Sequence, residues 1–384
     1  MNNFEFYCPT KMVFGKGSIA ELSELIDKDK KILMTYGGGS IKKNGVYDQV
    51  KKALKNHTLI EFSGIEPNPT YETCMKAVGI VKRENIDFLL AVGGGSVLDG
   101  TKFIAAAAKY EGKEPYEIVS KELPIKEALP VGSVMTLPAT GSEMNCAAVI
   151  SRLETKEKFA MRNPQSYPVF SIVDPETTYS LPIEQVRNGI VDTFVHVMEL
   201  YATYDVNTPL QDSWALGLIK TLIQEAPKVL KNNKDYDAKA NICWCATCGL
   251  NYWLSVGAVQ DWSTHRIGHE LTAFYGIAHG QSLAVVLPRL WKERKKNKSV
   301  KLAKLAREVY GCKEKDDLKA ADCAIEKTEE FFNSIGMKTK LKDYKIDSLE
   351  AAQKIKDRFK KRKTLLGEDL KITPDMVYNI LKNC

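Results

Sequence analysis

Long hydrophobic stretches are absent from this chain. The longest purely apolar run, Phe103 to Ala108, has six residues, whereas a membrane-spanning helix needs about 20. The first residues, Met1 to Phe6, contain no basic stretch followed by an apolar core, so no secretory signal is visible. We therefore expect a cytoplasmic location and no membrane partner.

Internal repeats and low-complexity linkers are absent as well. Hydrophobic residues make up 44% of the sequence and charged residues 27%, which is typical of a chain that folds throughout. The net charge of +7 is small for 384 residues and gives only a weak argument for a polyanionic partner. At about 150 residues per domain, this length predicts two or three domains.

A paired cysteine framework is missing, because the nine cysteines form an odd and scattered set. A chain of this size builds its core without disulfides, so we expect reduced, buried thiols. Cys243, Cys245 and Cys248 lie close together and could be interpreted as a zinc or redox cluster. Their spacing has no second matching pair, and we favour core packing.

The first part of the chain, up to about residue 180, alternates short β-rich runs with amphipathic stretches. This alternation is typical of strands joined by crossover helices and predicts an α/β domain over residues 1–180. The strands expected here are Phe4 to Tyr7, Lys11 to Phe14, Lys31 to Tyr36, Thr58 to Phe62, Phe88 to Val92, Gly132 to Leu137, Ala147 to Leu153 and Val169 to Val173.

The pattern changes after Leu181-Pro182, because later segments have helical apolar spacing and no run alternates with a period of two. We expect an all-α domain over residues 181–384, with helices near 183–204, 209–231, 236–256, 261–275 and 281–296.

Basic residues gather between Arg289 and Arg307, where nine of them meet one acid, Glu293, and again from Arg358 to Lys363. A binding protein for nucleic acid is one interpretation of these runs. Leu302 and Leu305 give the first run a buried side, so we favour a solvated helix face and no nucleic-acid partner.

Two Gly-Gly-Gly-Ser stretches each follow an apolar strand and precede a helix. Glycine allows a sharp turn and leaves backbone N–H groups open to phosphate, and the helix N-terminus that follows favours an anion. Neither stretch fits G-x-G-x-x-G, and a single glycine triplet is often a turn without a ligand. Two in equivalent settings favour a nucleotide site, with candidate residues Gly37, Gly38, Gly39, Ser40, Gly94, Gly95 and Ser96.

No acidic residue ends the strand Lys31 to Tyr36, where an NAD-specific site carries a carboxylate for the adenosine ribose. The first glycine stretch is followed by Lys42 and Lys43, which leaves room and positive charge for a 2′-phosphate. The predicted cofactor is therefore NADP(H).

Histidine is scarce, at five residues, and four of them lie in one pattern in the helical half. Asp192 and His196 are four residues apart, as are His265 and His269, and His279 follows. Residues at this spacing share one helix face. A carboxylate and several imidazoles from different helices suit Fe(II) or Zn(II), although spacing alone does not choose among the last three histidines.

These residues and motifs resemble the iron-containing alcohol dehydrogenases, specifically their NADPH-dependent butanol dehydrogenase or aldehyde reductase branch. The resemblance runs nearly end to end and rests on long motifs. They are the opening Asn3 to Tyr7 with Pro9 to Lys11, both glycine stretches, the continuation Val97 to Lys102, the segment Thr136 to Asn145, Asp192 with His196, and the segment His265 to His279.

The resemblance implies a Rossmann-like parallel-sheet domain followed by a helical domain, and it implies roles for individual residues. Asp192, His196, His265 and His279 would be the metal ligands. Asp99 would lie on the nicotinamide side, and His269 would relay a proton or only shape the pocket. The implied cofactor contacts add Thr136, Thr140, Asn145 and Lys158 to the glycine stretches.

The implied reaction is the reversible transfer of hydride between NADP(H) and a primary alcohol or aldehyde at a divalent metal. A rival with the same fold is a glycerol dehydrogenase or a lyase similar to dehydroquinate synthase. Proteins similar to this one build a dimer with their N-terminal strands, so we expect a homodimer.

Overall fold

The computed structural model describes residues 1–384, and they form two compact units. The sheet unit comprises Tyr7–Pro182 and Asn232–Asn251, and the helical unit comprises Met1–Phe6, Ile183–Lys231 and Tyr252–Cys384. The division into residues 1–180 and 181–384 stays a prediction. The units differ from it chiefly because residues 232–251 pack with the sheet unit.

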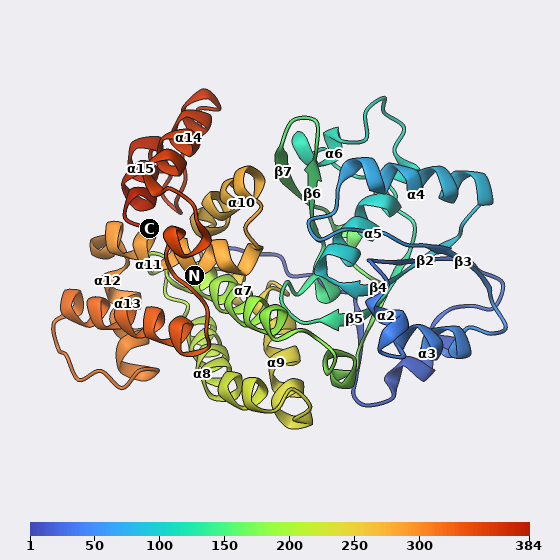
Figure 1. Ribbon diagram of the computed structural model, residues 1–384, viewed down its shortest axis with the longest axis horizontal. Coiled ribbons are helices and arrows are strands. Elements are labelled where there is room, and N and C mark those ends of the chain that lie inside the picture. The colour runs from blue at the N-terminus through green and yellow to red at the C-terminus, as the bar shows by residue number, and fades with distance from the viewer. The chain divides into compact units, whose positions relative to one another are not determined.

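Six parallel strands in the order β1-β8-β5-β4-β2-β3 form the centre of the sheet unit. Figure 1 labels β2 to β5 of this sheet. A separate antiparallel hairpin joins β6 and β7. The strands are β1 (Lys11–Phe14), β2 (Lys31–Tyr36), β3 (Thr58–Phe62), β4 (Phe88–Gly94), β5 (Val131–Leu137), β6 (Ala147–Arg152), β7 (Glu157–Arg162) and β8 (Phe170–Val173).

Helices cover both faces of this sheet, since its central strands are apolar on both sides. In β2, Leu33 packs in one core cluster, and Ile32 and Met34 pack in the other. Helices α4 (Tyr71–Glu84), α5 (Gly95–Lys109) and α6 (Glu117–Ser120) contribute to the first cluster, and α1 (Leu22–Leu25), α2 (Ser40–Lys43) and α3 (Val46–Ala53) to the second. Helix α9 (Tyr236–Gly249) adds Cys243 to a small third cluster.

The helical unit contains no strand. Its helices are α7 (Ile183–Tyr201), α8 (Pro209–Lys231), α10 (Ser263–Tyr275), α11 (His279–Glu293), α12 (Lys295–Glu308), α13 (Asp317–Ser334), α14 (Ser348–Lys361) and α15 (Pro374–Lys382). Helix α7 is buried along its whole second half and packs against α8 and α11. The expected parallel-sheet domain followed by helices is confirmed.

Several local expectations are wrong. Residues Phe4 to Tyr7 form no strand and are exposed, because no neighbouring strand pairs with them. Strand β7 was not expected, since only Phe159 and Met161 of this charged segment face the apolar core. The expected helix over residues 236–256 ends at Gly249, shortly before Tyr252 adopts a positive φ of 73°.

The prediction that the basic run from Arg289 to Arg307 forms a solvated helix face is also wrong for several of its residues. Lys298 and Lys301 are buried and form ion pairs, Lys298 with Asp261 at 2.8 Å and Lys301 with Asp212 at 2.6 Å. Arg294 pairs with Asp369 at 2.7 Å. These cations are engaged inside the helical unit, which further weakens a nucleic-acid interpretation of the run.

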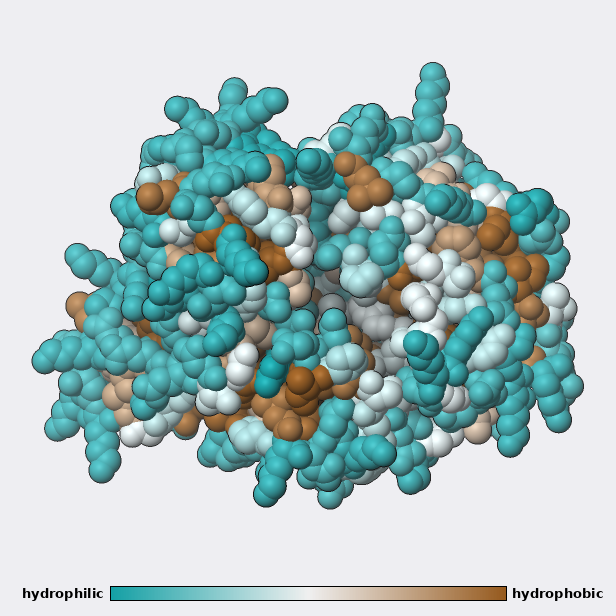
Figure 2. Space-filling view, in the orientation of Figure 1, coloured by the Kyte–Doolittle hydropathy of each residue, from teal (hydrophilic) through white to brown (hydrophobic).

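The exposed surface is mainly hydrophilic on the face drawn in Figure 2, with hydrophobic residues in separate areas. None of the helices is both long and apolar enough to cross a membrane. None of the nine cysteines forms a disulfide, and Cys243, Cys245 and Cys248 are buried, as core packing requires.

Candidate functional site

Three helices of the helical unit bring a carboxylate and imidazoles together. Asp192 and His196 lie on α7, His265 on α10, and His279 at the start of α11. One donor atom from each of Asp192, His265 and His279 lies within 4.8 Å of the other two. Asp192 Oδ1 is 3.5 Å from Nε2 of His265, 3.5 Å from Nε2 of His279 and 3.6 Å from Nδ1 of His196.

These separations fit a divalent metal better than they fit hydrogen bonds. Four donors about 2.1 Å from a tetrahedral ion lie roughly 3.4 Å from one another, whereas N–H···O bonds usually measure about 2.7–3.2 Å. Asp192 Oδ1 and His265 Nε2 are buried and have no hydrogen-bond partner. Buried polar atoms without partners are costly, and a cation at this point satisfies both.

Neighbouring charges shift the pKa values of Asp192 and His265. Burial alone would raise the pKa of Asp192, but the imidazoles of His196, His279 and His265 outweigh it and hold the pKa below its usual range. Burial lowers the pKa of His265, but Glu199 and Asp192 outweigh that effect and raise it to about 9. The Asp192 carboxylate is thus ionised, as a metal ligand must be, whereas His265 has to lose a proton when its Nε2 binds a metal.

His196 and His269 lie beside this group. The ring of His196 stacks on that of His265, with centroids 4.5 Å apart, but His196 is outside the close group of three donors. The ring centroid of His269 lies 5.3 Å from that of His279 and 6.2 Å from that of His265. Their assignments as fourth ligand and proton relay stay predictions.

Glu199 is a residue of this site that the sequence interpretation missed. It is buried on α7 and bonds through its carboxylate to Nδ1 of His265. The signal was present in the sequence, because Asp192, His196 and Glu199 follow the spacing i, i+4, i+7 of one helix face. Glutamate was passed over because charged helix residues are usually solvated.

A tightly packed glycine turn lies in the sheet unit, where β4 ends and α5 begins. A Cβ at Gly93 would lie 2.5 Å from Val97, and one at Gly95 would lie 2.4 Å from Thr140. Close packing therefore excludes side chains from this turn. The turn opens on the N-terminus of a helix of 15 residues, where free N–H groups and the helix dipole favour an anion.

The first glycine stretch, Gly37 to Ser40, lies at the adjacent strand end, since β2 and β4 pair with Tyr36 opposite Val92. Gly39 needs its positive φ of 92°, but at Gly38 no positive φ is found and a Cβ would meet nothing within 4 Å. Packing does not explain glycine at position 38. Open space beside backbone N–H groups is what a bound phosphate requires.

Lys158 reaches this region from β7. Its Nζ donates to Asn68 Oδ1 at 2.8 Å, and the backbone N–H of Asn68 donates to Ser96 Oγ at 3.2 Å. The structure thus links two predicted cofactor residues through Asn68, which the sequence interpretation did not single out. Its signal is the Glu66-Pro67-Asn68-Pro69 turn, where Asn68 has a positive φ of 58°.

Asp99 and Asn145 belong to a buried network around Lys102. Asp99 accepts hydrogen bonds from Ser142 Oγ at 2.7 Å and from the Val149 N–H at 3.0 Å. Lys102 Nζ donates to Ser142 and to Asn145, and burial lowers the pKa of Lys102 to about 8. This network holds the segment that follows β5, which carries Thr140. Thr136 is buried near the end of β5.

An acidic residue does lie near the end of β2, on the neighbouring strand. Glu61 of β3 accepts hydrogen bonds from the hydroxyls of Tyr36 at 3.0 Å and Tyr47 at 2.8 Å, and from Lys51 at 3.2 Å. The Lys42 ammonium lies 4.9 Å from the Tyr47 ring centroid. Both oxygens of Glu61 are engaged by the protein, while Lys42 and Lys43 are exposed.

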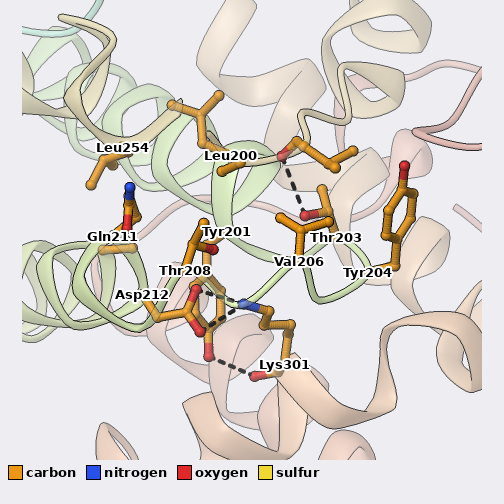
Figure 3. A pocket seen from close by; sticks show the side chains of 13 residues that line it. Leu200, Tyr201, Thr203, Tyr204, Val206, Thr208, Gln211, Asp212, Leu254 and Lys301 are labelled. Atoms are coloured by element: carbon orange, nitrogen blue, oxygen red, sulfur yellow. Dashed lines mark hydrogen bonds and ion pairs between the residues drawn. The ribbon is translucent and has the colours of Figure 1, made fainter. Parts of the chain in front are cut away.

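A small pocket elsewhere in the helical unit is not this site (Figure 3). It has about 10 Å³ of free volume, which is space for about one water molecule. Lys301 pairs there with Asp212, and the Tyr201 hydroxyl donates to the Lys301 carbonyl at 2.9 Å. The pocket contains none of the predicted ligands.

Two family models match this chain, one before and one after the predicted domain boundary near residue 180. Residues 9–175 match the model described as "Iron-containing alcohol dehydrogenase", and residues 187–384 match "Fe-containing alcohol dehydrogenase family, C-terminal". The chain belongs to the iron-containing alcohol dehydrogenase family. The family expected from the motifs is thereby confirmed, and with it the class of metal-dependent oxidoreductase.

Members of the iron-containing alcohol dehydrogenase family resemble this chain over its full length. The NADPH-dependent aldehyde reductase YqhD of Escherichia coli is 50% identical over 98% of both chains. The probable NADH-dependent butanol dehydrogenase 1 of Bacillus subtilis is 42% identical, over 100% of this chain and 99% of its own. A crystal structure of E. coli YqhD has a TM-score of 0.97 at 48% identity and covers 100% of this chain and 98% of its own.

Proposed function

We propose that this protein reduces aldehydes to primary alcohols with NADPH, reversibly and at a divalent metal, Fe(II) or Zn(II). The observation that carries the proposal is the group of Asp192, His265 and His279, whose donors are spaced as metal ligands. The identity to an NADPH-dependent aldehyde reductase supports the substrate class.

The residues of the helical unit would hold the metal and place the substrate carbonyl. Asp192, His265 and His279 supply one oxygen and two nitrogen donors, and we assign the fourth position to His196. A divalent ion held there polarises a carbonyl and stabilises the negative charge that develops on its oxygen. His269 lies next to His279, and we assign it the transfer of a proton to that oxygen.

The sheet unit would bind the dinucleotide, whose nicotinamide supplies the hydride. Gly94, Gly95 and Ser96 present the α5 N-terminus to the pyrophosphate, and Lys158 approaches the same helix end through Asn68. For the first glycine stretch, Gly37 to Ser40, the supporting observations are the open space at Gly38 and the engagement of Glu61. Both favour a 2′-phosphate over a free ribose diol.

The test is the initial rate of NADPH oxidation, and separately of NADH oxidation, with butanal. Metal-free protein should be inactive and should recover after anaerobic addition of Fe(II) or Zn(II), with NADPH preferred. Absence of turnover with either metal and either cofactor would refute the proposal. A His269→Ala variant with an unchanged kcat and pH profile would leave that residue only a role in shaping the pocket.

We also propose a homodimer in the cytoplasm. Strand β1 lies at an edge of the sheet and pairs only with β8, so its free backbone groups offer a site for another strand. The exposed Tyr7 and Phe14 add apolar surface near it. Cysteines without disulfides suit a reducing compartment. Sedimentation at micromolar concentration should give twice the chain mass, and a monomer would contradict the dimer.

A further inference from the structure

Glu199 binds the first turn of α10 through three contacts. Its Oε2 bonds to Nδ1 of His265, its Oε1 accepts from the backbone N–H of Thr264 at 2.5 Å, and its Oε2 also accepts from the backbone N–H of His265 at 3.3 Å. Its backbone carbonyl accepts from the N–H of Asp261 at 2.8 Å. One buried residue of α7 thus fixes the segment that leads into α10.

These contacts determine how His265 presents its ring. A neutral imidazole carries one N–H and one lone pair. When Nε2 is a metal ligand the ring is neutral, and the bond to Glu199 then keeps its one proton on Nδ1. Nε2, which lies 3.5 Å from Asp192 Oδ1, is left with the lone pair that a metal needs. Without Glu199, Nδ1 loses the contact that fixes the tautomer of the ring. A carboxylate behind an imidazole also makes its other nitrogen a stronger donor.

We infer that Glu199 is a positioning residue for the metal, acting through His265. The inference rests on the proposed metal site. Carboxylates in this position typically change metal affinity by about 10- to 100-fold when they are replaced, so the Glu199→Gln variant should bind metal at least about tenfold more weakly than the wild type.

Glu270 provides a matched control on α10 itself. It is buried like Glu199, but its carboxylate pairs with Arg358 at 2.6 Å and with Arg362 at 2.8 Å. The Glu270→Gln variant therefore removes a buried negative charge from the helix that carries His265 without removing the Nδ1 contact. Its metal affinity should stay close to that of the wild type.

The experiment measures the Zn(II) dissociation constant by competition with a chromophoric chelator, and the visible absorption of the Co(II)-loaded protein as a signature of ligand geometry. Glu199→Gln should weaken Zn(II) binding and alter the Co(II) spectrum, while Glu270→Gln should change neither. Equal affinities for the two variants would overturn the inference. If Glu199→Gln does not fold, Glu199→Asp, which draws the carboxylate back by one methylene, should still bind Zn(II) more weakly than wild type, and unchanged binding would overturn it.

Zn(II) binding by the wild type and by His265→Ala distinguishes a failure of the positioning role of Glu199 from a failure of the proposed metal site. Stoichiometric Zn(II) binding by the wild type that is lost in His265→Ala supports the metal site. Absence of Zn(II) binding in the wild type refutes the site itself, and the positioning role of Glu199 with it. Binding that depends on His265 but not on Glu199 refutes only the positioning role.

Discussion

Replacement of Lys298 by methionine tests how the helical unit tolerates its buried charges. Lys298 is 1% exposed. Its ammonium donates to the Ala202 carbonyl at 2.6 Å, to Asp261 at 2.8 Å and to Glu368 at 3.1 Å. Asp261 accepts in turn from the backbone N–H of Ser263 at 2.9 Å, where α10 begins. Methionine keeps most of the side-chain volume and leaves two carboxylates without their cation.

The expected loss of unfolding free energy is about 5 kcal/mol near neutral pH. Removing one partner of a buried ion pair costs about 3–5 kcal/mol, and here two carboxylates lose the same partner. In the wild type, burial raises the pKa of Asp261 but Lys298 outweighs it and holds the pKa below its usual range. Burial already raises the pKa of Glu368 despite Lys298, so removal of the ammonium leaves the folded-state pKa of both carboxyls above their unfolded values. The folded variant then takes up protons as the pH falls, so its deficit relative to wild type shrinks towards about pH 5.

The assay is denaturant-induced unfolding followed by tryptophan fluorescence and circular dichroism. Measurements between pH 5 and pH 8 span the range in which the two carboxyls of the variant take up roughly one proton each. Lys296→Met is the control, because Lys296 is exposed on the same helix and should change stability by less than about 0.5 kcal/mol. Combining Lys298→Met with Asp261→Asn and Glu368→Gln should restore part of the loss. A Lys298→Met variant as stable as the control, or a deficit independent of pH, would refute the reasoning.

Three further outcomes are expected. His265→Ala should lose metal, measured by elemental analysis after dialysis, and should lose turnover; retained metal with normal turnover would contradict the ligand assignment. Gly38→Asp should fold, because a Cβ there meets nothing within 4 Å, and should weaken NADPH binding at least about tenfold in fluorescence titrations, since a carboxylate repels a 2′-phosphate; equal NADPH binding would count against this subsite. Burial lowers the pKa of Lys102 from 10.5 to about 8, so between these two pH values the folded protein binds fewer protons than the unfolded chain. The free energy of unfolding of the wild type relative to Lys102→Met should therefore rise by up to about 3 kcal/mol as the pH increases from 8 to 10.5. A difference that does not change with pH would disprove it.

The sheet was largely predictable because its strands carry their own signal. Runs such as Lys31 to Tyr36 are buried on both faces and are followed directly by glycine, and β2 has the predicted bounds. Segments that depend on partners were not predictable. Phe4 to Tyr7 has strand composition without a neighbouring strand, and β7 has a neighbour but little apolar composition. In both cases pairing across the chain, rather than local pattern, determines the outcome.

The chemistry of the candidate site followed from rarity and spacing, whereas its supporting contacts did not. Few histidines and an acid four residues before His196 pointed to a metal. Glu199 and Asn68 act through contacts with residues 66 and 28 positions away in sequence, which no local spacing encodes. Lys298 and Lys301 were misread for the same reason, since their carboxylate partners lie 37 and 89 residues away.

Because residues 232–251 pack with the sheet unit, the chain passes between its two units four times, after residues 6, 182, 231 and 251. A chimera with a relative that is joined only near residue 182 would combine a sheet from one parent with α9 from the other. In this chain Thr247 Oγ1 donates to the buried Glu143 at 2.6 Å. In the chimera these two residues would come from different parents. Fragments that begin at residue 183 carry α9 without the sheet against which Cys243 packs. Recombination within this family should therefore exchange residues 232–251 together with the N-terminal block.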